Sequence, residues 1–145
     1  MEIDHKNPAK AAQQIADIIR KRELPRIDAI QCNHKYHRSG RTTEECIANQ
    51  RKYGLRDIDN YIKDFLGKKD SIYKNRKQKA VDLIKQMKEG IIIGVDFHGK
   101  GDEFTCDLCK ALSGKTLTIY ETDLIIESAS HYGCSVGLLG KVELL

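Results

Sequence analysis

Two short segments decide how the end of this chain folds: CDLC at residues 106–109 and, after a gap of 21 residues, HYGC at residues 131–134. In each segment two intervening residues let both outer side chains reach one ion across a tight turn. Three thiolates and one imidazole complete a tetrahedron, the usual ligand set of a structural zinc site, with no position left open for catalysis. The spacing therefore predicts one zinc ion bound by Cys106, Cys109, His131 and Cys134.

Two alternatives use the same cysteines without a metal. A disulfide would join Cys106 to Cys109, or one of them to Cys134, and buried free thiols would pack as small apolar groups. The chain has five cysteines, and in a reducing compartment an odd set favours ligands or free thiols over disulfides. His98 is the rival fourth ligand, ranked below His131 because it has no paired neighbour.

A second group of ligand-type residues occurs earlier, with the irregular order C-x-H-x2-H-x8-C. All four residue types are good zinc ligands, so a second metal site is a hypothesis. The alternative is a surface loop whose histidines and basic residues contact phosphate, with the last cysteine buried on a helix. The group consists of Cys32, His34, His37 and Cys46.

The apolar pattern changes character at Gly90. Before it, helical spacing predicts helices over residues 8–24, 43–53, 57–66 and 71–89, ended by Leu24-Pro25, Gly54, Gly67 and Gly90. After it, the pattern predicts strands over residues 91–97, 115–120 and 142–145, with residues 121–130 ambiguous between helix and loop. We therefore expect an α+β protein with a helical region at 1–89 and a small β-rich zinc-knuckle domain at 90–145.

Composition and charge distribution narrow the possible partners and location of the protein. The net charge is +4, but residues 1–101 carry 22 Lys and Arg against 14 Asp and Glu, whereas residues 102–145 carry 3 against 7. The basic part of the chain is typical of a surface that binds nucleic acid or an acidic partner. The alternative is a solvated helical surface. No apolar run is long enough for a membrane span, and the amino end lacks an apolar leader, so we expect a cytoplasmic or virion location.

No pattern typical of a catalytic site is present. The chain lacks a phosphate-binding glycine loop, a nucleophile elbow and an HExxH helix. Residues 43–66 allow a helix-turn-helix interpretation about Gly54. However, the second helix carries acidic residues where a DNA recognition helix prefers basic and amide side chains. The expectation is a protein that is not an enzyme.

The segment from Gly101 to Lys115, with the strand and helix before it, resembles the carboxy-terminal part of phage head-morphogenesis (minor capsid) proteins. In that family an acidic turn runs into a Thr-Cys pair, and a His and a Cys follow downstream, as at residues 131–134. The resemblance implies the same four knuckle ligands, with Leu112 and Gly114 at packing and turn positions, and a role in head assembly. Ser135-Val136 stands where the family commonly has an Arg-Cys pair.

These observations give a ranked set of functions. The leading hypothesis is a non-enzymatic, phage-type zinc-binding protein that acts by binding another protein, in head assembly or as a structural part. The first alternative is a zinc-dependent nucleic-acid-binding or regulatory protein that uses the basic residues 20–41 and 68–88. A phage-encoded inhibitor of a host defence enzyme is the third, and none of these predicts an oligomeric state.

Overall fold

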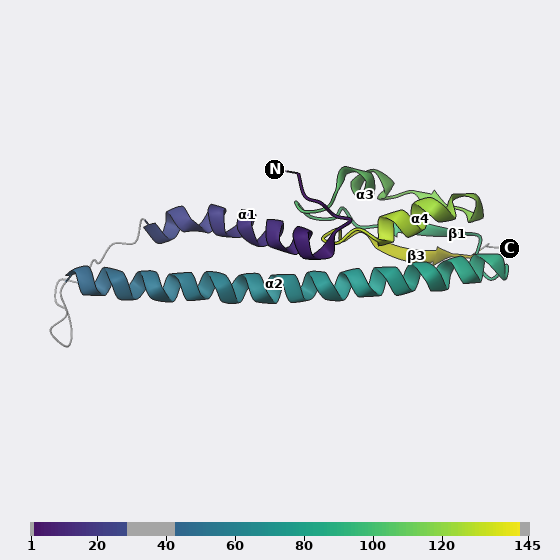
Figure 1. The fold of residues 1–145 in the computed structure, drawn as a ribbon. Coiled ribbons are helices and arrows are strands. Elements are labelled where there is room, and N and C mark those ends of the chain that lie inside the picture. The colour runs from purple at the N-terminus through teal and green to yellow at the C-terminus, as the bar shows by residue number, and fades with distance from the viewer. Residues whose placement is uncertain (1, 29–42, 143–145) are drawn as a thin grey trace. The chain divides into compact units, whose positions relative to one another are not determined.

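The computed structural model describes residues 2–28 and 43–142, and within them helices come first and a small sheet follows (Figure 1). The α+β class is confirmed. No helix in this part of the chain has both the length and the apolar character that a bilayer span requires. The elements are α1 (Pro8–Asp28), α2 (Thr43–Lys88), β1 (Gly94–His98), α3 (Asp107–Leu112), β2 (Thr116–Leu117), the 3-10 turn η2 (Ile119–Glu121), α4 (Thr122–Ala129) and β3 (Gly137–Lys141).

The chain divides into two compact units, and each long helix contributes to both. The helical unit comprises residues 16–66, and the knuckle unit comprises residues 1–15 and 67–145. The change from helix to strand falls between Lys88 and Gly94, near the expected boundary at residue 89. Whether 1–89 and 90–145 act as separate domains stays a prediction.

The predicted breaks within the helical region are wrong. A single helix of 46 residues, α2, runs through both Gly54 and Gly67. Glycine in a helix interior costs only about 0.5–1 kcal/mol relative to alanine, which is too little to end a helix of this length. The helix-turn-helix interpretation fails with the same observation, because no turn separates its two helices. Likewise α1 continues through Pro25 to Asp28, since a proline this close to the end interrupts little.

The sheet has the order β2-β1-β3, and both pairings are antiparallel. Val95 lies opposite Leu117 on one side and Gly140 on the other, and Phe97 lies opposite Leu138. Because side chains alternate along a strand, the buried Val95 and Phe97 share the face that is turned toward the core.

The strand predictions located the sheet but misjudged its ends. The first strand starts at Gly94 rather than residue 91, and the last is residues 137–141, while residues 143–145 lie outside the described part. The predicted strand at 115–120 shrinks to two residues. There Thr118 accepts a hydrogen bond from the Tyr120 amide, and Glu121 accepts one from the Thr118 amide, so a capped turn replaces the strand.

One apolar core joins α2, the three strands, α3 and α4 in the knuckle unit. It draws side chains from α2, the sheet, α3 and α4, and it includes two of the predicted ligands. Those ligands therefore lie inside the core rather than on a surface loop. The buried members are Ala80, Leu83, Ile84, Met87, Ile92, Val95, Phe97, Cys109, Leu112, Leu117, Ile125, Ala129, Cys134, Val136 and Leu138.

The continuity of α2 can be tested at Gly67. An added methyl group there meets no atom within 4 Å. We predict that Gly67→Ala raises the free energy of unfolding by about 0.5–1 kcal/mol, because alanine loses less backbone entropy than glycine in a helix. Urea denaturation measures the change.

Gly99→Ala is the matched control for that substitution. Its methyl group also meets no atom within 4 Å, but φ is +87°, in the left-handed region. Stability should fall by about 1–2 kcal/mol at this position. Destabilisation by Gly67→Ala would instead show that the helix is broken at residue 67, as the sequence pattern predicted.

Candidate metal centre

The first pair of ligands is fixed by the start of α3. Cys106 is the N-cap of this helix, and its Sγ accepts a hydrogen bond from the Cys109 amide at 3.4 Å. Capping by the sulfur turns it toward the first helical turn, which carries Cys109. The two-residue spacing thus brings both sulfurs together across a helix N-terminus.

The second pair lies on the segment that joins α4 to β3. His131 follows the last turn of α4, and Cys134 precedes the strand. Between them Gly133 has a φ of +92°, a conformation that other residues rarely adopt. The glycine therefore allows the chain to turn so that His131 and Cys134 approach the first pair.

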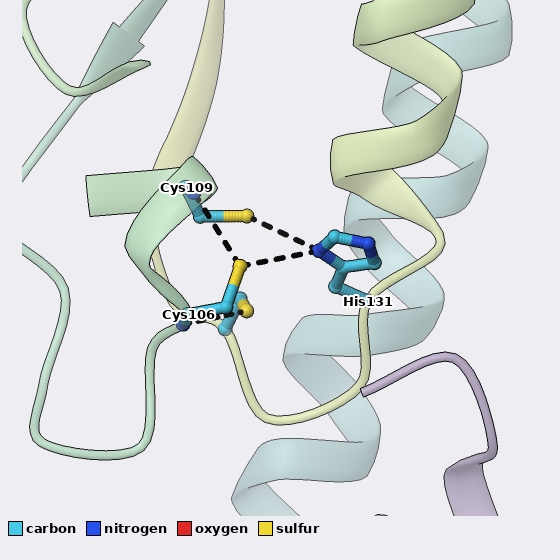
Figure 2. A group of neighbouring side chains, drawn as sticks. Cys106, Cys109 and His131 are labelled. Carbon is cyan, nitrogen blue, oxygen red and sulfur yellow. Dashed lines mark hydrogen bonds between the residues drawn. The ribbon is translucent and has the colours of Figure 1, made fainter. Parts of the chain in front are cut away.

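The four side chains converge on one point. The Nδ1 of His131 lies 3.3 Å from Cys106 Sγ and 3.6 Å from Cys109 Sγ (Figure 2). One ligand atom from each of the four residues, Cys134 included, lies within 4.8 Å of every other. Around a tetrahedral zinc with bonds of about 2.3 Å to sulfur and about 2.0 Å to nitrogen, a sulfur and a nitrogen are about 3.5 Å apart. The donor set fits a zinc ion.

The site is closed off from solvent on most sides. Cys109 and Cys134 are buried, His131 is 5% exposed, and Cys106 is half-buried. Cys106, Cys109 and Cys134 carry no disulfide. With four protein ligands so close together and so little solvent access, the arrangement suits a metal that holds the fold rather than one that binds substrate.

The three sulfurs do not share one electrostatic environment. A hydrogen bond from the Cys134 thiol, assisted by Ser128, lowers the pKa of Cys109 to about 4 despite burial. The same hydrogen bond, from the donor's side, raises the pKa of Cys134, and burial raises the pKa of Cys106. One thiolate is therefore favoured within the cluster, and a bound cation would stabilise the other two in that form.

His131 presents Nδ1 to the sulfurs, so Nδ1 is the atom that would bind a metal. Its Nε2 is buried and has no hydrogen-bond partner among the described residues. The imidazole ring of His5 lies close to the His131 ring, and their centroids are 6.1 Å apart.

The amino-terminal segment also reaches this site, which the sequence did not predict. The Tyr132 amide donates to the His5 carbonyl at 2.8 Å, and His5 Nδ1 donates to the Tyr132 carbonyl at 2.7 Å. His5 Nδ1 also lies 3.7 Å from Cys134 Sγ. The contact spans 127 residues, and no local pattern signals a pairing over such a separation.

Two buried cations on α2 were missed as well. Lys69 donates to the Gly133 carbonyl at 2.8 Å, and Arg76 donates to Ser128 Oγ at 2.9 Å. A signal for them exists in the sequence: Lys69 and Arg76 are seven residues apart and lie in phase with the apolar positions Ala80 and Leu83. Charged residues in line with an apolar face indicate buried charge.

The other predicted ligands lie elsewhere. His98 is exposed at the end of β1, with its ring over Gly137, and does not belong to the cluster. In the second predicted group, Cys46 is half-buried on α2, where its sulfur accepts a hydrogen bond from Gln50. Cys32, His34 and His37 lie outside the described residues, so a second metal site stays a prediction.

Comparison of the chain with protein-family models, with curated proteins and with solved structures found no match. The interpretation of the site therefore depends on its own geometry.

The cluster can be tested by removing one ligand. We predict that Cys109→Ser abolishes stoichiometric zinc binding and lowers the free energy of unfolding by more than about 3 kcal/mol, because binding to a structural zinc site contributes on the order of 10 kcal/mol. Elemental analysis and thermal unfolding, with and without a chelator, measure both effects.

Cys46→Ser is the control, since it removes a thiol outside the cluster while leaving the knuckle intact. It should keep one zinc ion per chain and unfold at nearly the original temperature. Full stability of Cys109→Ser, or equal effects of the two substitutions, would show that the cluster does not hold the fold.

Proposed function

We propose that this chain is a non-enzymatic zinc protein that acts by binding another protein, as a structural or assembly component of a phage-type particle. The observation that carries the zinc assignment is the convergence of three thiols and one imidazole inside the core of the knuckle unit. Zinc is the metal that such a ligand set favours. The phage role draws its support from the sequence resemblance around the Cys106–Cys109 pair.

The structural role of zinc follows from what the ligands connect. Cys106 and Cys109 belong to the start of α3, whereas His131 and Cys134 belong to the connection between α4 and β3. A single ion would join two ends of a fold whose core lacks tryptophan and holds few aromatic side chains. Small cores of this kind are often stabilised by a metal.

Three exposed aliphatic side chains at one end of the sheet support the proposal of a protein partner. Ile91, Ile93 and Val142 are each between 48% and 59% exposed. The Ile93 amide donates to the Lys141 carbonyl at 2.8 Å, which places Ile93 beside Val142. Neighbouring exposed aliphatic side chains are more typical of an interaction site than of a solvated strand end.

The test is co-expression with phage capsid and portal proteins. We predict that a complex of fixed stoichiometry co-purifies with the zinc-loaded chain, and that Ile93→Asp with Val142→Asp lowers recovery at least tenfold while zinc content is unchanged. Tyr120→Asp, at an exposed position on η2, is the control and should retain the complex. Absence of a complex with any of these proteins would refute the assembly role but not the zinc site.

A second function, nucleic-acid binding, is favoured by one specific feature of α2. Lys74, Lys77, Lys85 and Lys88 are exposed and follow helical spacing, with Val81 between them. We call these four residues the lysine stripe. It extends about 21 Å along the helix axis. None of the four forms an ion pair with a described residue, so their charges are available to a polyanion such as a phosphate backbone.

Salt dependence distinguishes this function from the first. If four lysines each neutralise one phosphate, affinity for random duplex DNA should fall with salt with a logarithmic slope of about −3.6. Changing the lysine stripe to glutamine should flatten that slope. A control variant changes four exposed lysines elsewhere in the knuckle unit: Lys68, Lys110, Lys115 and Lys141. It removes the same charge but should keep most of the slope. Equal slopes for the two variants would refute a specific role of the stripe.

A further inference from the structure

The knuckle unit buries two cationic side chains, and their surroundings differ in one respect. Lys69 is 3% exposed and forms an ion pair with Asp102, so its charge is compensated. Arg76 is 5% exposed, and no carboxylate pairs with it among the described residues. Burying a charge without a counter-charge costs several kcal/mol, so the Arg76 guanidinium needs another source of negative charge.

The contacts of Arg76 all lead to the metal ligands. Its Nη2 donates to Ser128 Oγ at 2.9 Å and lies 4.0 Å from Cys109 Sγ. Ser128 Oγ is itself 3.3 Å from Cys109 Sγ, and Arg76 Nη1 lies 3.5 Å from the Cys134 carbonyl. Arg76 therefore faces the ligand cluster directly and through one hydroxyl group.

We propose that Arg76 is the counter-charge of a metal centre that carries a net charge of −1. This inference rests on the proposed zinc function and specifies the charge of the loaded site. A divalent cation bound by three thiolates and a neutral imidazole has that net charge, and the guanidinium brings the buried group to neutrality.

The consequence is a specific link between α2 and the metal. Arg76 lies on the same helix face as Ala80 and Leu83, which pack in the core. Its charge is stable in this position only when the cluster is anionic. An anionic cluster thus stabilises the packing of this part of α2 on the knuckle.

A double-mutant cycle between Arg76 and a ligand tests the charge rather than the fold. Cys106→His changes the ligand set from three thiolates and one imidazole to two of each, which makes a centre of zero net charge with a divalent cation. Cys106 is the suitable ligand to change because it is the half-buried member. Dissociation constants for Co²⁺ and Zn²⁺, measured by competition with a chelator, give the readout.

We expect Arg76→Met to weaken metal binding about 10–100-fold in the native chain, the range typical of residues that support metal ligands. In the Cys106→His chain the same substitution should weaken binding less than threefold. Arg76→Lys, which keeps the charge, should retain most of the native affinity. Equal losses in the two backgrounds would overturn the proposal.

Lys69→Met is the matched control, because its charge is balanced by Asp102 and not by the ligands. Its effect should be the same in both backgrounds. If Arg76→Met does not fold, folding restored by adding Cys106→His supports the proposal, and a double variant that also fails to fold refutes it. A native chain that binds no metal would refute the proposed zinc function itself, an outcome separate from equal losses in the cycle.

Discussion

The convergence of two ligand pairs is the constraint on which the rest of the knuckle unit depends. Cys106 and Cys109 are held by the N-terminus of α3, and His131 and Cys134 by the turn at Gly133. Cys109 and Cys134 belong at the same time to the apolar core. The core and the cluster therefore form together, because neither pair can reach the other unless the sheet and helices are packed around them.

The structure also shows how α2 takes part in a site to which it contributes no ligand. Lys69 and Arg76 extend from its buried face to the backbone around Gly133 and Cys134. These side chains satisfy carbonyl groups that a tight turn would otherwise leave buried without a donor. The sequence pattern of α2 is typical of a solvated basic helix, yet α2 also positions the loop that carries His131 and Cys134.

The four residues of the cluster could be predicted from the sequence because their signal is local. The Cys106–Cys109 spacing and the His131–Cys134 spacing each specify geometry within four residues, and the change of pattern near residue 90 separates helix from strand. The sequence pattern was not sufficient where the outcome depends on distant contacts. Gly67 is a typical helix stop signal, yet α2 continues through it, with Ile62 and Lys69 buried on either side. The contact of His5 with Tyr132 has no local signature at all.

The two faces of α2 carry different features, the contacts to the Cys/His cluster on one and the lysine stripe on the other. Arg76 faces the cluster, while Lys74 and Lys77, within one turn of it, are exposed. A cluster without negative charge would leave the Arg76 charge buried and uncompensated, and the simplest relief is movement of that turn toward water. Such a movement would displace Lys74 and Lys77 from the stripe. Any partner that recognises the exposed face of α2 would therefore bind in a way that depends on the charge of the cluster, even though it contacts none of the four residues.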